Sequence, residues 1–556
     1  MKYYSDEAKN GVIPECSVYD FMFSQNKKYQ NMKALRYFGK SITYKELFEK
    51  IEHAMLVLTS LGIKKGDIVG VITVAIPEFV YIFYALDRMG VIQNMIDPRT
   101  SADGINDYLE ETEAKYLIVL DVLFPDIVNA IKPEKYQNII YLSASDSLMG
   151  IKKHILRMFN KRKLNASVLR YGIYYSSIVI NSAEDIRIET YNEDKCCVII
   201  HTGGTTGSPK SVMLSDKNIN ALVWQSMHTE NGMNRGESWL DIMPPFIAYG
   251  VGMGLHLPLS IGMETILIPQ FDPFKFDDLI VKHKPNHMVG VPSYWNTIIN
   301  SRKLDKMDLS YIVAPTVGGD TLDKNLEIRV NEFLREHGSD WKITKGYGMT
   351  EVCAGVCGTS KMVNELGSVG IPFVHSLISI FDSNTGEELQ YNQEGEICIT
   401  GPNVMLGYYN NSDETDKILR MHSDGKKWIH SGDIGYMDEN GSLFVLGRMK
   451  RMIIRYDGFK IFPVQIEGVI KQNEIISDAA VVGIKDRNHS QGKLAYAFIV
   501  APNIDDEKLI NEVSKMCEEQ LPEYARPIGY KVVNEIPLTD IGKVDYRKLE
   551  EMINND

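Results

Sequence analysis

The stretch His201–Lys210 has the residue types needed to bind a polyphosphate. It reads His-Thr-Gly-Gly-Thr-Thr-Gly-Ser-Pro-Lys and follows the apolar run 197–200, which predicts a buried strand. Glycines let backbone N–H groups turn toward a ligand, and the hydroxyls and one ammonium add further donors. Because Pro209 stands where a Walker A loop has its second glycine, the stretch is not of that type. A surface turn rich in Gly and Thr is the alternative for this stretch alone. The residues expected to contact phosphates are Thr202, Gly203, Gly204, Thr205, Thr206, Gly207 and Lys210.

A second stretch, 346–351, combines an aromatic ring, glycines and a carboxylate. The ring of Tyr347 could stack on a flat base, with the backbone of its glycine neighbours close by. The carboxylate of Glu351 is a hard oxygen ligand of the kind that Mg²⁺ prefers. A Gly-rich turn further upstream precedes a predicted helix that begins near Leu322. The candidate residues of these two stretches are Gly318, Gly319, Asp320, Gly346, Tyr347, Gly348, Met349 and Thr350.

Two charged residues nearer the C-terminus complete the set that could do chemistry. Asp433, in His-Ser-Gly-Asp, can accept hydrogen bonds from both hydroxyls of a ribose, and Arg448 follows fifteen residues later. Lys543 lies in Gly-Lys-Val-Asp. A mobile lysine is a compact charge that can pair with both a carboxylate and a phosphate. Taken singly, a Gly-Asp pair is usually a turn and a lysine near a C-terminus is usually solvated.

In this order the motifs resemble those of the adenylate-forming enzymes, which include acyl- and aryl-CoA synthetases, adenylation domains of peptide synthetases and firefly luciferase. The resemblance covers about residues 30 to 550. It implies that Tyr347 contacts adenine and Thr350 the α-phosphate region. It also implies that Thr202 and Glu351 hold magnesium and that Asp433 binds the ribose. Lys543, with Thr202 and Glu351, would then be catalytic.

The elements that must position these residues alternate between helix and strand. Helical periodicity over 44–61 and 77–89 flanks a strand-like run at 68–74, which predicts an α/β fold with parallel sheets. A further strand-like run covers 341–344, and Asp-Glu-Asn-Gly at 438–441 predicts a hairpin turn. The length of 556 residues predicts two or more domains. The resemblance implies a large multi-sheet N-terminal adenylation domain, 1–448, and a small mobile α/β domain, 449–556.

The same resemblance implies a two-step reaction and a moving domain. ATP and Mg²⁺ would activate a carboxylic acid to acyl-AMP with release of pyrophosphate, and coenzyme A would then take the acyl group. The small domain would rotate about a hinge at Lys450, which removes Lys543 and brings in the loop after Asp457. The residues of that loop expected near CoA are Gly458, Phe459 and Lys460.

The acid is expected to bind in a pocket lined by Phe246, Tyr249, Gly250 and Gly254. The small residues leave room for a bulky or long apolar acid, and helix packing is the alternative for them. No Asp occurs between Pro244 and Gln270 to pair an amino group, which favours a fatty or other hydrophobic acid. The Gly-Lys-Val-Asp form of the Lys543 loop instead resembles peptide-synthetase domains. A stand-alone ligase that loads a carrier protein therefore stays open, as does a non-catalytic nucleotide sensor.

The composition limits the kinds of partner and the cellular location that we expect. A net charge of −13 argues against general nucleic-acid binding. Seven cysteines, an odd number, suggest reduced thiols and a cytoplasmic location. Cys353 and Cys357 are spaced as a metal pair would be, but no second Cys/His pair at zinc spacing accompanies them. The N-terminus lacks the apolar core of a signal peptide, and no apolar run is long enough to span a bilayer.

The segment 152–170 departs from this acidic background. It is rich in Lys and Arg, contains no Asp or Glu, and has Ile155, Leu156, Met158 and Phe159 interleaved with its basic residues. A basic amphipathic helix can lie on an anionic membrane surface. Peripheral membrane contact is thus one interpretation of this segment, and a solvated surface insertion is the other.

Overall fold

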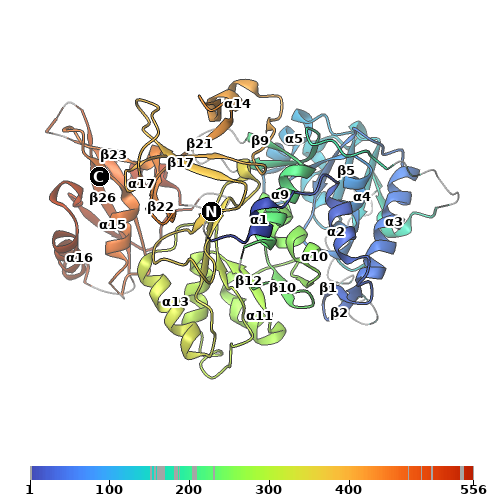
Figure 1. The fold of residues 1–556 in the computed structure, drawn as a ribbon, viewed down its shortest axis with the longest axis horizontal. Coiled ribbons are helices and arrows are strands. Elements are labelled where there is room, and N and C mark those ends of the chain that lie inside the picture. The colour runs from blue at the N-terminus through green and yellow to red at the C-terminus, as the bar shows by residue number, and fades with distance from the viewer. Residues whose placement is uncertain are drawn as a thin grey trace.

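The computed structural model is an α/β assembly of several sheets with helices between and around them (Figure 1). It describes residues 3–148, 150, 153, 155, 158, 170–180, 186, 188–202, 210–229, 232–473, 475–486, 488, 489, 491–501, 505–538 and 544–554. The predicted fold class, a large multi-sheet N-terminal part with a small α/β part after it, is confirmed.

The first sheet has eight strands in the order β19-β9-β8-β4-β3-β5-β6-β7. The strands from β8 to β7 run parallel, whereas β9 pairs antiparallel with β8 and with β19. The predicted polyphosphate-binding stretch therefore connects two strands of a hairpin. The bounds are β3 (Ile68–Ile72), β4 (Ile92–Met95), β5 (Tyr116–Leu120), β6 (Asn138–Leu142), β7 (Ile173–Tyr174), β8 (Cys196–Thr202), β9 (Lys210–Ser215) and β19 (Gly407–Tyr408).

The second sheet has nine strands in the order β16-β15-β14-β13-β12-β10-β11-β1-β2. The strands from β14 to β1 are parallel, and antiparallel strands close both edges. Ligands of α/β proteins bind beyond the carboxyl ends of such strands, where β13 and β14 lead into the two glycine-rich stretches. The bounds are β1 (Lys33–Tyr37), β2 (Lys40–Thr43), β10 (Ser238–Asp241), β11 (Glu264–Leu267), β12 (His287–Gly290), β13 (Thr316–Val317), β14 (Thr344–Tyr347), β15 (Cys357–Gly358) and β16 (Ile371–Pro372).

The helices of the N-terminal part begin where local signals place them. The helix α3 (Tyr44–Ser60) starts at a capping box formed by Thr43 and Glu46, and α4 (Pro77–Arg88) starts at its proline. Both match the predicted ranges within one residue. The remaining helices here are α1 (Asp6–Asn10), α2 (Val18–Asn26), α5 (Ala102–Glu111), α6 (Phe124–Ile131), α9 (Asp216–Met227), α10 (Leu257–Ile261), α11 (Phe276–His283), α12 (Pro292–Ile299), α13 (Lys324–Glu336) and α14 (Ser412–Ile418).

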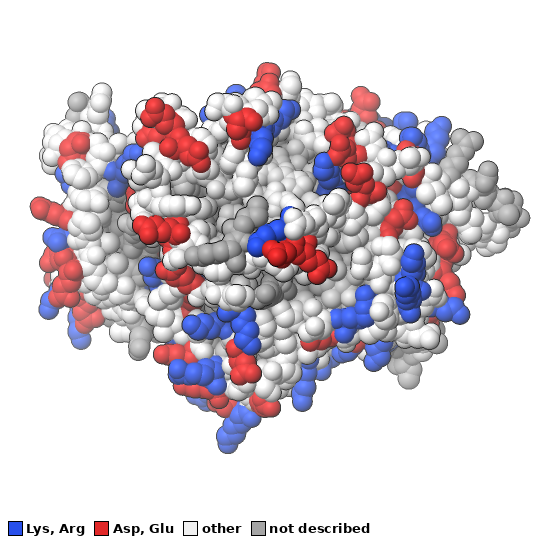
Figure 2. Space-filling model, viewed as in Figure 1, with Lys and Arg blue, Asp and Glu red and all other residues white. Residues whose placement is uncertain are grey.

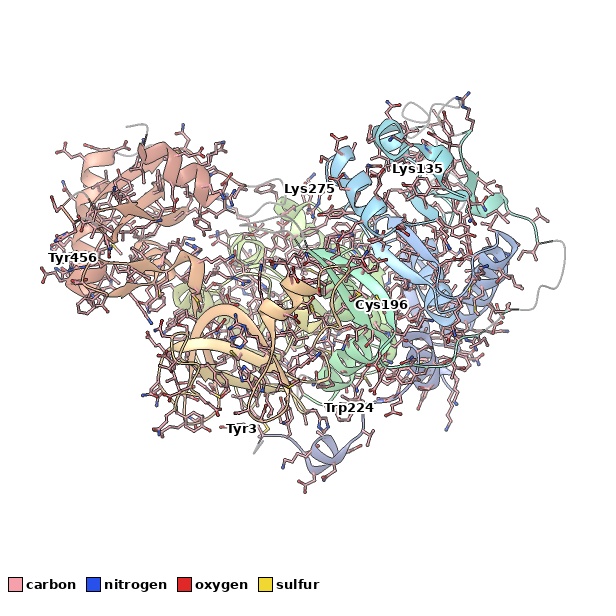
Figure 3. The ribbon with its side chains drawn as sticks, turned by 90° about the horizontal axis from the view of Figure 1, so that it is seen from above. Tyr3, Lys135, Cys196, Trp224, Lys275 and Tyr456 are labelled. Atoms are coloured by element: carbon pink, nitrogen blue, oxygen red, sulfur yellow. The ribbon has the colours of Figure 1, made fainter. Side chains whose placement is uncertain are left out.

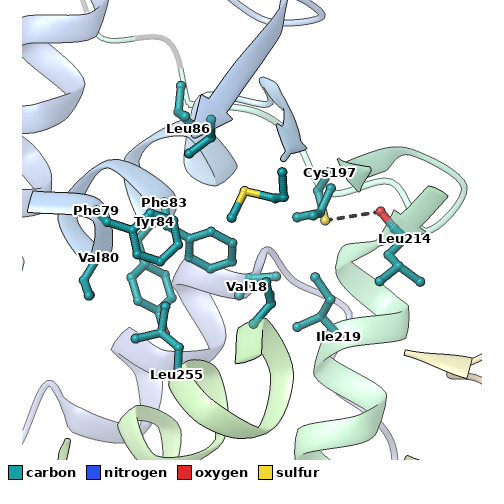
Figure 4. Packing of buried hydrophobic residues seen from close by; sticks show 14 of the residues in the cluster. Val18, Phe79, Val80, Phe83, Tyr84, Leu86, Cys197, Leu214, Ile219 and Leu255 are labelled. Atoms are coloured by element: carbon teal, nitrogen blue, oxygen red, sulfur yellow. Dashed lines mark hydrogen bonds between the residues drawn. The ribbon is translucent and has the colours of Figure 1, made fainter. Parts of the chain in front are cut away.

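The largest core packs α4 against the first sheet and its neighbouring helices. Phe79, Phe83 and Tyr84 of α4 are almost completely buried among aliphatic side chains. Figure 4 shows these rings beside Val18 and Leu255, with the Cys197 thiol directed at the carbonyl of Leu214 at 3.4 Å. Nearly every residue of α4 is buried, including the acidic Glu78 and Asp87, so the helix is covered on all faces.

A third, antiparallel sheet carries the segment with Asp433. Its order is β17-β18-β21-β20, and β22 pairs with β21. The predicted turn at 438–441 connects β21 to β22, and the resulting register places Asp433 opposite Arg448. The bounds are β17 (Leu377–Phe381), β18 (Gly395–Thr400), β20 (Leu419–Met421), β21 (Lys427–Met437) and β22 (Leu443–Arg448).

The chain after β22 forms a smaller unit with its own core. It contains a short β-hairpin, a three-stranded sheet and three helices around a cluster that includes Ile466, Val481 and Val513. This unit lies at one end of the molecule in Figures 1 and 3, where Tyr456 marks it. The bounds are β23 (Ile453–Ile454), β24 (Lys460–Ile461), β25 (Asp478–Lys485), β26 (Lys493–Val500), β27 (Tyr530–Val533), α15 (Pro463–Ile470), α16 (Asp506–Gln520) and α17 (Tyr546–Asn554).

A buried ion pair connects α13 to the strand that ends at Tyr347. The side chains of Lys345 and Glu327 are 4% and 2% exposed, and the Lys345 ammonium contacts the Glu327 carboxylate. The ammonium also donates to the carbonyl of Glu365 at 2.8 Å, and the carboxylate accepts the N–H of Gly367 at 3.0 Å. Burial lowers the pKa of Lys345, and the hydrogen bond with Glu327 opposes that shift.

We expect Lys345→Met to lower the free energy of unfolding by about 3–5 kcal/mol, because it leaves the Glu327 carboxylate buried without a cation. The double variant Lys345→Met/Glu327→Leu should lose much less, since no charge then remains. Urea-unfolding midpoints followed by tryptophan fluorescence measure both. A double variant as unstable as the single one would contradict the assignment.

Candidate active site

The β8–β9 hairpin holds the two ends of the predicted phosphate loop together. Thr202 and Lys210 are register partners, and the Thr202 hydroxyl accepts the Lys210 N–H at 3.2 Å. The hairpin thus places two residues of the predicted set side by side at the base of the loop. The other predicted loop residues, Gly203, Gly204, Thr205, Thr206 and Gly207, lie outside the described residues.

Two residues that the sequence analysis missed surround the Lys210 ammonium. Its Nζ lies 2.6 Å from a carboxylate oxygen of Glu414 in α14 and 4.8 Å from the centre of the Tyr408 ring. Hydrogen bonds from Lys210 and Lys417 lower the pKa of Glu414 to about 2. Nothing in the sequence links Lys210 to positions two hundred residues away, so only the pairing of β9 with β19 reveals this contact.

Tyr408 also contacts the predicted metal ligand. Its hydroxyl donates to Glu351 Oε1 at 2.8 Å, and the Glu351 carbonyl accepts the N–H of Met405 at 2.9 Å. Burial and the nearby Glu351 charge raise the pKa of Tyr408, so the phenol stays protonated and donates. The Glu351 side chain is buried, with one oxygen held by Tyr408. This fixed carboxylate is an oxygen donor of the kind that a hard divalent cation such as Mg²⁺ prefers.

A second carboxylate, Asp433, is held by residues from two sheets. Its Oδ2 accepts the Tyr347 hydroxyl at 2.7 Å, and its Oδ1 lies 2.9 Å from Arg448 Nε. Its backbone N–H donates to the Ser431 hydroxyl at 3.0 Å. Burial raises the pKa of Asp433, and the Arg448 charge opposes that shift. The phenol end of Tyr347 is thereby fixed, which leaves the ring face as the part that can stack on a base.

The glycines of the two turns are required by close backbone approach. A Cβ on Gly348 would lie 1.8 Å from the carbonyl oxygen of Ala354, and Gly319 has φ of +84°. A Cβ on Gly318 would lie 3.1 Å from the Tyr249 hydroxyl, which places the predicted acyl-pocket tyrosine beside the predicted nucleotide turn. Asp320 is exposed and accepts the N–H of Thr321 at 2.7 Å. The motif partners Gly346, Met349 and Thr350 lie on the same segment as Tyr347.

The predicted acyl-pocket residues lie on and before a π-helical segment, 250–256. Phe246 is buried, with the Arg99 guanidinium 5.4 Å from its ring centre. A Cβ on Gly250 would lie 1.8 Å from the Pro244 carbonyl oxygen, and one on Gly254 would lie 2.8 Å from Asp241 Oδ1. Both glycines are therefore required for packing, which was the alternative interpretation. Asp241 was not predicted; burial raises the pKa of this carboxyl strongly.

The predicted hinge and CoA-facing residues lie in the smaller unit. Lys450 is exposed directly after β22, and Gly458, Phe459 and Lys460 form the tip and return strand of the β23–β24 hairpin. Gly458 has φ of +85° and open space where a Cβ would be, and the Phe459 ring stacks on Tyr524 at 4.5 Å. Lys543 lies outside the described residues. Tyr546, three residues further on, packs its ring on Arg451 at 3.7 Å.

Surface charge and the basic segment 152–170 concern the predicted contact with a membrane. Acidic and basic side chains are interspersed over the face in Figure 2. Among the described residues, no helix is long and apolar enough to cross a membrane. Most of the basic segment 152–170 lies outside the described residues; Ile155 and Met158 are 49% and 72% exposed. Membrane contact through this segment stays a prediction.

The raised pKa of Asp433 predicts a specific pH dependence for nucleotide binding. Only the ionised carboxylate accepts two hydroxyl hydrogens, so adenosine nucleotides should bind less well as the pH falls. Because the pKa of Asp433 is raised, this loss of affinity should begin at a higher pH than it would for an aspartate with the ordinary pKa of 3.8. Asp433→Asn should weaken binding by about 10- to 100-fold and remove this acid limb. Titration calorimetry with AMP across pH measures both effects.

Arg448→Met is the matched variant for this test. Arg448 lowers the pKa of Asp433, so its removal should move the acid limb to still higher pH. An acid limb that is the same in wild type and in Asp433→Asn would show that another group titrates.

Comparisons with known proteins place the whole chain. A long-chain-fatty-acid–CoA ligase of Bacillus subtilis is 28% identical over 550 residues, with 97% of this chain and 95% of the relative covered. A probable 4-coumarate–CoA ligase of Dictyostelium discoideum is 28% identical and covers 99% and 97%. The crystal structure of ATP-bound MatB from Rhodopseudomonas palustris matches the fold with a TM-score of 0.80 at 22% identity, over 97% of this chain and 99% of that one.

Family models agree with these relatives and cover most of the chain. The model described as AMP-binding enzyme matches residues 22–409, which include the β8–β9 hairpin and the segment of Tyr347 and Glu351. The model described as AMP-binding enzyme C-terminal domain matches residues 465–543. The chain therefore belongs to the family of AMP-binding enzymes.

Proposed function

We propose that this protein is an AMP-forming acid–CoA ligase. It activates a carboxylic acid with ATP to acyl-AMP and pyrophosphate, and then transfers the acyl group to the thiol of CoA. The observation that carries this proposal is that two carboxylates are held in place by polar partners. Asp433, the proposed ribose acceptor, is held by Tyr347 and Arg448. Glu351 accepts from Tyr408, whose ring contacts Lys210. Both sequence relatives named above are CoA ligases, which supports the choice of thiol.

The first step needs charge control more than proton transfer. A carboxylate oxygen of the acid attacks the α-phosphorus, the bond to pyrophosphate breaks, and the electron pair leaves with pyrophosphate. Asp433 is assigned to orienting the ribose, and Lys210 and Thr202 are assigned to holding the β- and γ-phosphates. When bound by Glu351 and Thr202, Mg²⁺ would supply neutralisation of phosphate charge. Lys543 is assigned to the charge that develops at the α-phosphate.

The second step replaces AMP by a thiol. The thiol gives its proton to water, its sulfur attacks the acyl carbonyl, the bond from the acyl carbon to the phosphate oxygen breaks, and AMP leaves with the electron pair. We assign the approach path to the β23–β24 hairpin. Gly458 there has positive φ and open space beside it, which lets a narrow chain pass close to the backbone. Rotation about Lys450, between units 1–448 and 449–556, would bring this hairpin to the site.

The acid is assigned to the hydrophobic class. Phe246 is buried in the region of 246–254, and burial raises the pKa of the Asp241 carboxyl well above its usual range. Burial thus disfavours the charged form of Asp241 that would pair with an amino group. The two relatives act on acids of different shape by their names, one aliphatic and one aromatic.

We also assign the protein to the cytoplasm. All seven cysteines are free thiols, four of them buried within the N-terminal core and sheets and one in α16. An absence of disulfides in a chain with this many cysteines is typical of proteins from reducing compartments.

The central test is an acid panel assayed with ATP, Mg²⁺ and CoA, followed by AMP release. We expect release that depends on a fatty or other hydrophobic acid and on CoA. A holo-carrier protein in place of CoA distinguishes the carrier-loading ligase. Acid-dependent pyrophosphate exchange separates an enzyme from a nucleotide sensor, and no exchange with any acid would sink the proposal.

A half-reaction test addresses Lys543. Lys543→Ala should lower the adenylation rate by at least about 100-fold, since an electrostatic contact made in the transition state is lost. Thioester formation from synthetic acyl-AMP and CoA should be largely retained, because Lys543 is assigned to the first step only. Lys548→Ala, on the exposed part of α17, is the matched control. Equal loss of both half-reactions would contradict the assigned role.

A further inference from the structure

A group of metal-ligating side chains lies on the third sheet, separate from Glu351. Glu396 and Cys398 are two residues apart on β18, so their side chains share one face. His430 on β21 is the register partner of Cys398. We call Glu396, Cys398 and His430 the β18–β21 cluster. Two strands thus bring an oxygen, a sulfur and a nitrogen donor together, with no short sequence motif.

The three donor atoms surround one point. His430 Nδ1 lies 2.8 Å from Glu396 Oε2 and 3.5 Å from Cys398 Sγ, and all three atoms are within 4.8 Å of one another. Cys398 is fully buried, whereas the side chains of His430 and Glu396 are 12% and 11% exposed. The sulfur is therefore on the inner side of the cluster, and a water molecule can approach from the outer side.

The contacts of His430 Nδ1 differ between the two neutral tautomers of its ring. If Nδ1 carries a hydrogen, Glu396 accepts it, and the Cys398 sulfur, a weak acceptor, lies beside that bond at 3.5 Å. If Nδ1 is unprotonated, the thiol can donate to it, but the ionised carboxylate then faces a lone pair at 2.8 Å. Neither neutral tautomer makes strong hydrogen bonds to both neighbours. A cation between the three atoms would be bound by the carboxylate, the nitrogen lone pair and the thiolate together.

The surrounding residues already supply the outer hydrogen bonds of a metal site. His430 Nε2 lies 2.9 Å from His422 Nε2, so a metal-bound His430 can donate its remaining N–H to His422. The His422 ring is fixed between Trp428, stacked at 5.5 Å, and Phe381, edge-on at 4.7 Å. Glu396 Oε1 accepts the N–H of Gly432 at 3.1 Å, which orients the carboxylate. Such outer contacts fix the tautomer and orientation of metal ligands.

We propose that the β18–β21 cluster binds a divalent transition-metal ion of the zinc type, through Cys398 Sγ, His430 Nδ1 and Glu396 Oε2. Mixed sulfur, nitrogen and oxygen ligands favour Zn²⁺ over Mg²⁺ or Ca²⁺. On binding, the Cys398 thiol gives its proton to water and the sulfur bonds to the metal, while the imidazole proton moves to Nε2. Water takes the fourth position.

The proposed metal would stabilise the sheet and take no part in the proposed reaction. Its ligands do not include Asp433, but Glu396 contacts the N–H of Gly432, the residue before it. The ion would hold β18 and β21 in register where the sheet has a bulge between Glu396 and Cys398. Metal binding is measured without ATP or acid, so its failure leaves the proposed ligase activity untouched.

The test uses the full chain after removal of metal with a chelator and dialysis. Titration with Co²⁺ should give one equivalent bound, with the near-ultraviolet charge-transfer band of a cobalt–thiolate bond, and Zn²⁺ should displace it. Cys398→Ser should abolish the band, and His430→Gln should weaken binding at least tenfold. His422→Gln should weaken it by about 10- to 100-fold, as for an outer-contact residue. Cys517→Ser, in α16, is the matched control and should bind as wild type.

A second measurement uses only the wild-type protein, so its result does not depend on whether the variants fold. X-ray absorption of the zinc-loaded wild-type protein should show one sulfur at about 2.3 Å together with nitrogen and oxygen ligands. A zinc shell without sulfur, no cobalt–thiolate band in wild type, or an unchanged band in Cys398→Ser would each overturn the proposal.

Discussion

The buried carboxylate of Asp433 imposes the tightest constraint on this molecule. A carboxylate removed from water is costly unless charged or polar groups pair with it. Its partners come from different sheets: Tyr347 ends β14 of the nine-stranded sheet, and Arg448 ends β22 of the antiparallel sheet. The carboxylate is therefore satisfied only when the two sheets are docked in one arrangement. That arrangement also sets the position of the 346–351 segment relative to β21.

A second set of contacts ties the eight-stranded sheet to the same segment. Tyr408 pairs through β19 with β9, donates to Glu351 and lies under Lys210. One phenol thus connects the base of the phosphate hairpin with the candidate magnesium ligand. Three sheets meet around residues that are far apart in the chain, and each meeting point is a polar contact made by a buried or half-buried side chain.

Local sequence signals predicted the elements well where local physics decides them. The capping box at Thr43 and the proline at position 77 set the starts of α3 and α4 to within one residue of the predicted ranges. The hairpin turn before β22 was predicted by its Asp-Glu-Asn-Gly sequence and is confirmed. The strand predicted at 341–344 was misplaced: β14 covers Thr344–Tyr347, because pairing with β13 and β15 rather than local apolarity fixes its ends.

The residues of the candidate site could be predicted from the sequence mainly where they match family motifs. These motifs include Asp433, Arg448 and Tyr347, but they do not predict the hydrogen bond from the Tyr347 hydroxyl to the Asp433 carboxylate. Tyr408 and Glu414 were missed because each contacts a partner distant in sequence, and Asp241 was missed because only the fold shows that it is buried. The β18–β21 cluster was missed for the same reason: its ligands alternate along one strand and are completed by another, so no Cys/His spacing reveals them.

The Lys210–Glu414 contact gives the phosphate hairpin a resident counter-ion. The ammonium is neutralised by a carboxylate at 2.6 Å before any nucleotide arrives, and Lys417 lies on the far side of that carboxylate. If Lys210 binds phosphate as proposed, a triphosphate would exchange one anion for another instead of meeting an unpaired cation. Glu414 could return when the phosphates leave, so entry and release would both proceed by competition for a single cation.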